Sequence, residues 1–164
     1  MEGNIVLYDD EYQKIKEIIQ RLNEEANARV VFLVDKNGQQ IAACGEIENL
    51  DTTSLASLTA GNVAATDGLA KLIGEKEFSI LFHEGERDNI HISLVGKRVI
   101  LVVIFDQRSS LGLVRLRVKR ASIELERIFD AIVKKVEEKQ KEGENIETPF
   151  AEITDEDIDN LFSP

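Results

Sequence analysis

His83, His91 and Cys44 are the nitrogen and sulfur side chains of this sequence that could bind a metal ion. His83 and His91 would face each other across a hairpin centred near Arg87, which is the best metal-like geometry in the chain. Two imidazoles without a third ligand give weak support for a metal site, and Cys44 lies far from both in sequence. We therefore expect no metal.

Three arginines could act on a nucleotide that another protein holds. Arg87, Arg98 and Arg108 lie near predicted loops, and an arginine supplied in trans can stabilise a phosphoryl group during transfer. A phosphate-binding loop needs Lys-Ser or Lys-Thr directly after its last glycine. The pairs Gly61/Gly68 and Gly68/Gly74 are not followed by either, so we expect no such loop in this chain. No nucleophile stands beside a recognisable base, so we expect neither an active site nor a cofactor.

The acidic charge of the chain is concentrated in its tail. The 164 residues carry a net charge of −11, and residues 137–164 account for −8 of it, with ten acidic and two basic side chains. This balance excludes a nucleic-acid-binding protein, which needs a basic surface. A single cysteine, no signal peptide and no apolar run longer than residues 99–105 predict a cytoplasmic protein without membrane insertion.

Hydrophobic periodicity and turn residues predict the order α-β-β-α-β-β-β-α. Helices are expected from about residue 10, over 52–73 with Gly74 as its end, and from Ser110 for about 28 residues. A hairpin around Asn37-Gly38 and strands at 78–84, 89–95 and 98–106 complete the pattern. This order predicts an α/β (α+β) domain over 5–140, with a five-stranded antiparallel sheet between helices. Residues 141–164 are expected to form a flexible linker and an acidic tail.

The helix at 52–73 is unusually poor in charge, because only Asp67 and Lys71 are charged. We expect one apolar face to cover the sheet, formed by Leu55, Leu58, Leu69, Leu72 and Ile73. The other side has small residues at steps of three or four, which allow another backbone to approach: Ser57, Ala60, Gly61, Ala64, Gly68 and then Lys71. Each interior glycine costs roughly 0.5–1 kcal/mol relative to alanine. A second protein surface is therefore expected here, and packing under a loop of the same chain is the alternative.

The tail combines acidic residues with an amphipathic pattern. Thr154 can cap a short helix, and five apolar side chains are expected to dock on a partner: Phe150, Ile153, Ile158, Leu161 and Phe162. Such a short segment is marginal alone, so docking would be weak and would depend on tethering. Two targets are open, a partner protein or the basic cluster Arg115, Arg117, Lys119 and Arg120 of the last helix. A tail that only improves solubility is the alternative.

Four segments carry a family resemblance, in the order "VVFLVDKNGQ", "TTSLASLTAGNVAA", "LAKLIGE" and "LGLVRLRVKRAS". Together they resemble the Roadblock/dynein-light-chain family over roughly residues 5–136. The resemblance implies a profilin-like fold and a homodimer. In the family, the middle helix and the third strand of each subunit meet and join two sheets into one.

The resemblance further implies a regulator of a Ras-like small GTPase. It implies that a homodimer activates GTP hydrolysis by remodelling the GTPase, without an arginine finger, in the control of cell polarity and motility. A cell pole is one place where the protein would concentrate. We expect the GTPase to contact Ala60, Ala64, Asp67, Gly68 and Lys71. The rival interpretations are a passive scaffold of the Roadblock type and a sensory domain that holds a small molecule.

Overall fold

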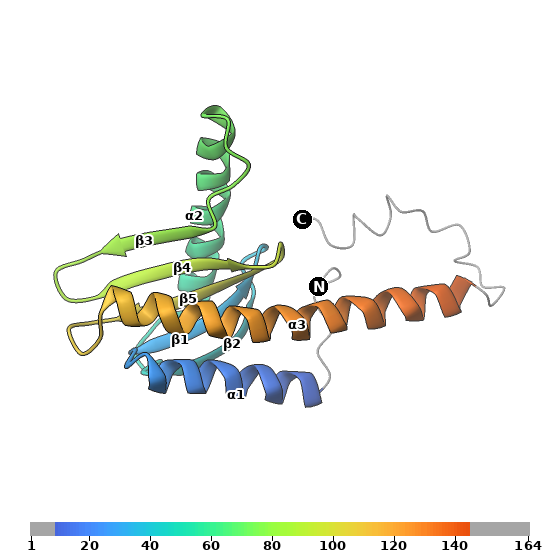
Figure 1. The fold of residues 1–164 in the computed structure, drawn as a ribbon, viewed down its shortest axis with the longest axis horizontal. Helices are drawn as coiled ribbons and strands as arrows, with labels where there is room; N and C mark the ends of the chain where they lie inside the picture. The colour runs from blue at the N-terminus through green and yellow to red at the C-terminus, as the bar shows by residue number, and fades with distance from the viewer. Residues whose placement is uncertain (1–8, 145–164) are drawn as a thin grey trace.

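The computed structural model describes residues 9–144 as three helices and a five-stranded antiparallel sheet (Figure 1). The strands lie side by side in the order β2-β1-β5-β4-β3. In chain order the elements are α1 (Asp9–Glu25), β1 (Val30–Asp35), β2 (Gln40–Gly45), α2 (Thr52–Leu72), β3 (Ile80–Glu84), β4 (Asn89–Val95), β5 (Val99–Phe105) and α3 (Leu111–Glu144). The predicted fold class and element order are confirmed. The predicted tail-docking residues, which run from Phe150 to Phe162, lie outside the described residues.

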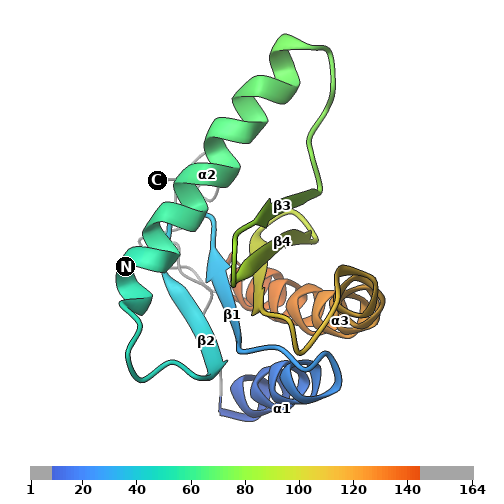
Figure 2. The ribbon, with the colours of Figure 1, turned by 90° about the vertical axis from the view of Figure 1, so that its left-hand side faces the viewer.

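The larger core lies between the sheet and the pair of helices α1 and α3. Figures 1 and 2 show these two helices side by side on one face, with α2 on the other. Leu33 of β1 and Leu101 of β5 are fully buried against Ile15, Ile19 and Leu125. All seven residues of β5 are buried, because both faces of this central strand are covered. The predicted apolar run at 98–106 is therefore a central strand.

Helix α3 is longer than its pattern predicted. It has 34 residues, which at ~1.5 Å per residue make a rod of about 51 Å. Its buried positions end at Ile132, and its last part extends beyond the sheet (Figure 1). The helix continues past the core because its sequence remains rich in helix-forming Glu and Lys.

The first half of α2 packs on the sheet through small side chains. Ala56, Ala60 and Val63 are buried there against Phe32 and Val102. The prediction that the long apolar residues cover the sheet is wrong for four of the five, because they are exposed: Leu58 by 73%, Leu69 by 60%, Leu72 by 83% and Ile73 by 69%. Leu69, Leu72 and Ile73 are exposed because the second half of the helix rises away from the sheet (Figure 2). Leu58 lies in the packed first half, on the side of the helix that does not meet the sheet.

The β1–β2 hairpin brings α2 close to the sheet. Asp35 Oδ1 accepts hydrogen bonds from the backbone nitrogens of Asn37 and Gln39, both at 2.9 Å. Gly38 has a φ of +90°, and a Cβ placed on it would lie 3.2 Å from Cα of Ser57. The predicted Asn-Gly hairpin is thus confirmed, and its glycine is also the point where the turn meets the helix.

Candidate partner-binding surface

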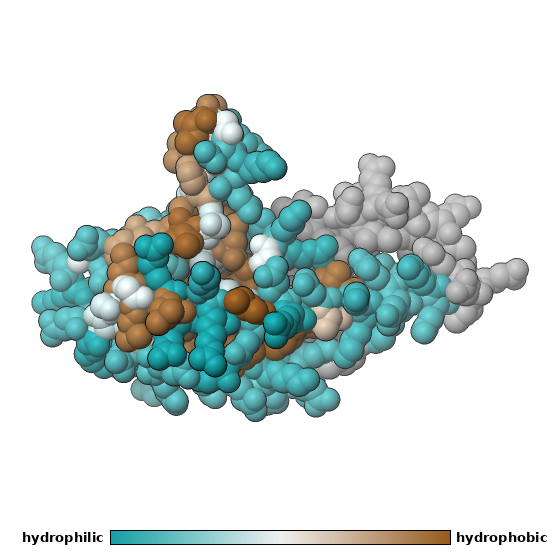
Figure 3. Space-filling model, viewed as in Figure 1, coloured by the Kyte–Doolittle hydropathy of each residue, from teal (hydrophilic) through white to brown (hydrophobic). Residues whose placement is uncertain are grey.

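Helix α2 carries an exposed stripe, along its packed and its projecting part, that no other element of residues 9–144 covers. The stripe consists of Leu58, Gly61, Ala65, Gly68 and Leu72, which follow one another at steps of three or four residues. All five are exposed, and Figure 3 shows hydrophobic side chains gathered on the projecting end of the helix. A Cβ built on Gly61 or Gly68 would meet nothing within 4 Å. The described chain therefore gives these two glycines no packing reason of its own.

Strand β3 provides a second open surface next to this helix. It pairs with β4 along one edge and ends the sheet, so its other edge pairs with nothing in the described part of the chain. Ile80 is 48% and Phe82 is 38% exposed. The amide of Asn62 on α2 lies 3.0 Å from Nε2 of His83 on β3. The exposed stripe and the free strand edge are thus held together.

The predicted GTPase-contacting residues lie along α2 in different environments. Ala64, Gly68 and Lys71 are exposed, and Asp67 is half-buried. Ala60 is only 9% exposed and belongs to the core cluster under the helix. Its side chain therefore packs between α2 and the sheet and is not available to a partner. The contact of the other four residues with a GTPase stays a prediction.

Comparison with known proteins identifies the fold. The family model described as "Roadblock/LC7 domain" matches residues 14–105. The chain belongs to the Roadblock/LC7 family. A separate comparison with curated protein sequences gives no match.

Solved structures of MglB proteins resemble this Roadblock domain over most of its length. MglB of Myxococcus xanthus is 62% identical, with a TM-score of 0.74, and the match covers 77% of this chain and 96% of that one. The gliding protein MglB of Thermus thermophilus is 37% identical, with a TM-score of 0.74, over 78% of this chain and 97% of its own. A structure named "MglB with tetrameric arrangement" is 35% identical, with a TM-score of 0.76, over 80% and 99% of the two chains.

The predicted pairing of the two histidines of this Roadblock domain is wrong. His83 lies opposite Ile90 and His91 lies opposite Phe82, so the two imidazoles point to opposite faces of the sheet. A shift of one residue in register moves every side chain of a strand to the other face. His91 is 1% exposed on the α3 side, whereas His83 contacts α2.

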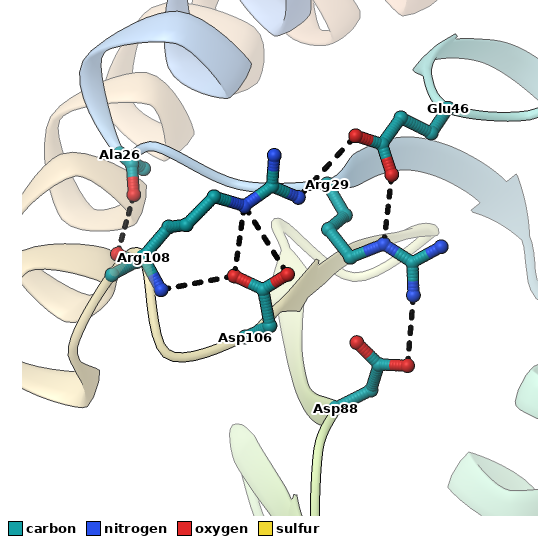
Figure 4. A network of polar contacts seen from close by, with 7 residues as sticks. Ala26, Arg29, Glu46, Asp88, Asp106 and Arg108 are labelled. Carbon is teal, nitrogen blue, oxygen red and sulfur yellow. Dashed lines mark hydrogen bonds and ion pairs between the residues drawn. The ribbon is translucent and has the colours of Figure 1, made fainter.

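A polar network ties the loops at one end of the sheet together (Figure 4). Arg29 donates to Glu46 Oε2 at 2.9 Å and to Asp88 Oδ2 at 2.8 Å. Arg108 donates to Asp106 Oδ1 at 3.0 Å and to Glu46 Oε1 at 3.3 Å. The hydrogen bonds from Arg29 and then Arg108 lower the pKa of the Glu46 carboxyl. Arg108 is thus engaged within its own chain and is poorly placed to serve as a finger on a second protein.

Possible metal ligands and the Cys44 thiol are the reactive groups that remain to be placed in the described part of the chain. Among residues 9–144, no three His, Cys, Asp or Glu side chains are grouped so that they could hold a metal ion. Burial raises the pKa of the Cys44 thiol to about 11, so it stays protonated at neutral pH and is a poor nucleophile. Within the same residues, none of the helices is long and apolar enough to cross a membrane.

Sequence reasoning found part of the exposed stripe, because it expected Gly61 and Gly68 to meet another protein, but it placed Leu58 and Leu72 on the sheet-covering face. Leu58 and Leu72 share a helical face with Gly61, Ala65 and Gly68. Periodicity shows that such a face is apolar but does not tell whether a sheet or a second protein covers it. The size of the side chains does not separate the two faces either, because the residues of α2 that do cover the sheet, Ala56, Ala60 and Val63, are themselves small.

Proposed function

We propose that this protein is a homodimeric activator of a Ras-like small GTPase of the MglA type, which acts in the control of cell polarity and gliding motility. The observation that carries the proposal is the 62% identity to Myxococcus xanthus MglB over 96% of that chain. The protein regulates its partner and has no active site of its own. It works in the cytoplasm, and a cell pole is one place where it would concentrate.

The homodimer forms through the exposed stripe of α2 and the free edge of β3. Burying a leucine such as Leu72 contributes about 1.5–3 kcal/mol, and Leu72 is 83% exposed in the single chain. The small residues Gly61, Ala65 and Gly68 between the two leucines let the helices of two subunits approach closely. Pairing of the two β3 edges then joins two five-stranded sheets into one.

The GTPase contacts the neighbouring side of the projecting helix, at Ala64, Asp67 and Lys71, and Gly68 lies at the boundary that this contact shares with the dimer stripe. These residues combine a small, close-approach surface with one acidic and one basic group. Activation comes from remodelling of the GTPase, so that its own residues complete the catalytic arrangement. This agrees with the engagement of Arg108 by Asp106 and Glu46, which leaves that guanidinium without a free role in trans.

The decisive experiment is single-turnover GTP hydrolysis by the cognate GTPase, alone and with this protein in excess. We expect a stimulation of at least about tenfold, which corresponds to about 1.4 kcal/mol of activation free energy. The double variant Ala64→Arg/Gly68→Arg should lose the stimulation and keep its circular dichroism spectrum. Ala64→Arg alone leaves the dimer stripe intact, so it should lose stimulation while it still sediments as a dimer. The matched control is Gly112→Arg/Ala131→Arg, which makes the same two changes at exposed positions of α3.

Two outcomes would contradict parts of this proposal. Binding without stimulation would make the protein an adaptor of the Roadblock type. Full stimulation by the Ala64→Arg/Gly68→Arg variant would remove this face of α2 from the docking site.

The dimer has its own test. Leu58→Glu/Leu72→Glu should sediment as a folded monomer, because both leucines are exposed in the single chain, by 73% and 83%. Ala131→Glu on α3 is the control and should remain a dimer. A dimer in the double variant would place the interface elsewhere.

The acidic tail is proposed to dock weakly on the GTPase through Phe150, Ile153, Ile158, Leu161 and Phe162. Deletion of residues 145–164 should leave the dimer intact and change GTPase affinity or nucleotide exchange. If both stay unchanged, the tail serves only solubility.

A further inference from the structure

A pocket of about 500 Å³ lies between the β3–β4 hairpin and the first half of α3, on the face of the sheet opposite α2. Its volume falls in the range of small-molecule sites, roughly 300–1,000 Å³. Its polar lining consists of Ser79, His91, Ser93, Arg115, Lys119 and Ser122. The proposed contacts on α2 use none of these residues. Ile80, which also lines the pocket, belongs to β3, whose free edge is the other part of the proposed dimer surface.

The floor of the pocket contains hydrogen-bonding groups that the described chain leaves unused. His91 is 1% and Ser93 is 5% exposed. Among residues 9–144, the two ring nitrogens of His91 and the hydroxyl of Ser93 have no hydrogen-bond partner. Buried polar groups are nearly always paired, because an unpaired one has lost its water without compensation. His91 and Ser93 are neighbours on one face of β4, so these three unpaired atoms lie on the same side of the sheet. A bound molecule could supply their missing hydrogen bonds.

The rim of the pocket is positively charged. Arg115 and Lys119 lie one helical turn apart on α3, and both are exposed. Neither makes a salt bridge to an acidic side chain of residues 9–144, and no Asp or Glu lines the pocket. In a chain whose net charge is −11, a pocket with two unpaired cations and no acid selects for a negatively charged occupant.

Apolar side chains complete the wall beside these charges. Ile80 and Leu116 line the same pocket and are 48% and 62% exposed. Convergent polar donors beside an apolar wall are typical of a site for a small amphipathic molecule. An acidic helix docked on the rim would neutralise Arg115 and Lys119, but it would leave the enclosed groups of His91 and Ser93 unpaired.

We propose that this pocket binds a small organic anion. Its carboxylate or phosphate group lies between Arg115 and Lys119 and completes the hydrogen bonds of the serine hydroxyls and His91. Its apolar part lies on Ile80 and Leu116. The proposal is independent of the GTPase.

The two histidines of the chain allow a direct test by NMR. His91 reports on the pocket, and the exposed His83 on the opposite face is an internal reference. The full-length protein is titrated with inorganic phosphate and, separately, with hexanoate, at constant ionic strength, while the Cε1–H signals of both imidazoles are followed. We expect one or both anions to shift the His91 signal saturably at concentrations up to about 10 mM, with the His83 signal unchanged. A stronger response to hexanoate assigns a carboxylate with an apolar chain, and a stronger response to phosphate assigns a phosphorylated molecule.

Charge variants separate a built site from general attraction of anions. Arg115→Ala and Lys119→Ala should each weaken binding by about tenfold. Arg127→Ala is the matched control, because Arg127 is exposed on α3 and does not line the pocket. Equal effects of all three variants, or no saturable shift of His91, would overturn the proposal. A shift of the His91 signal on deletion of residues 145–164 without added anion would also overturn it, because the occupant would then be the acidic tail.

Discussion

Asn62 of α2 donates its side-chain amide to Nε2 of His83 on β3 across 3.0 Å. The backbone oxygen of Asn62 also accepts a hydrogen bond from Thr66 Oγ1 at 2.8 Å, one turn further along the helix. This contact joins the projecting part of α2 to the edge strand of the sheet. The stripe of α2 and the free edge of β3, which are proposed to form the dimer, are therefore linked by a hydrogen bond within each subunit.

Asn62→Ala should weaken the dimer and change the stability of the single domain little. The contact is solvent-exposed, so we expect a loss of about 0.5–1.5 kcal/mol from dimerisation, measured by sedimentation at several concentrations. His83→Ala should have the same effect, and the double variant should be no worse than either single one. Fully additive effects would mean that the two side chains act separately.

Gly38 and Gly61 should respond in opposite ways to alanine. Gly38 has a φ of +90°, and its added Cβ would lie 3.2 Å from Ser57 Cα. Gly38→Ala should therefore lower the free energy of unfolding by about 1–2 kcal/mol or more, as measured by urea denaturation.

Gly61→Ala should stabilise α2 by about 0.5–1 kcal/mol in the monomer, because its Cβ meets nothing in the chain. In the proposed dimer the same methyl group would push the two helices apart, so the dissociation constant should rise. The measurement is made in the monomeric Leu58→Glu/Leu72→Glu background and in the wild-type background. Gly112→Ala, also without neighbours within 4 Å, is the control and should leave the dimer unchanged.

Arg29→Ala should disconnect three loops at one end of the sheet. Arg29 bridges Glu46 and Asp88, and its side chain is 28% exposed. We expect a loss of about 1–2 kcal/mol of unfolding free energy, read from thermal or urea denaturation. Arg29→Lys should recover only part of it, because an ammonium group cannot reproduce the two-sided guanidinium geometry. Unchanged stability in Arg29→Ala would show that the loops are held by other contacts.

His91 should make the domain less stable in mild acid. Burial, and then the charge of Arg115, lower the pKa of its imidazole below the ordinary value of 6.5. As the pH falls below 6.5, the unfolded chain takes up a proton that the folded chain does not. Stability is therefore lost by up to about 1.4 kcal/mol per pH unit until the folded pKa is reached.

The check for His91 is a comparison of unfolding free energies between about pH 5 and pH 7 in wild type and His91→Leu. The variant should lose this part of the pH dependence, whereas His83→Ala should keep it. An identical pH profile in wild type and His91→Leu would show that other groups account for the acid sensitivity.

The sequence alone determined most of the fold of this protein, because local patterns specify its elements. The apolar run of β5 and the Asn37-Gly38 turn each act within a few residues. So does the cap of α2, which the structure assigns to Asp51, whose side chain accepts from Ser54 N at 3.1 Å. The order of the elements and their short connections then left few ways to arrange one sheet. The unusual character of α2 was also visible, because its lack of charge is a property of composition.

Tertiary structure decided which face of α2 is covered and on which face of the sheet each histidine lies. Small residues such as Ala56 and Ala60 meet the sheet because Gly38 lets the hairpin approach the helix, and the leucines are left outside. Both faces of this helix are apolar, so either face could have been buried against the sheet. The spacing of the apolar residues therefore did not predict which one is covered. His91 lies under α3 because it pairs with Phe82 in the β3–β4 hairpin. A shift of this pairing by one residue would move a side chain to the other face of the sheet. Distances between elements and register within a sheet are set by contacts far apart in sequence, and these contacts exist only once the chain is folded.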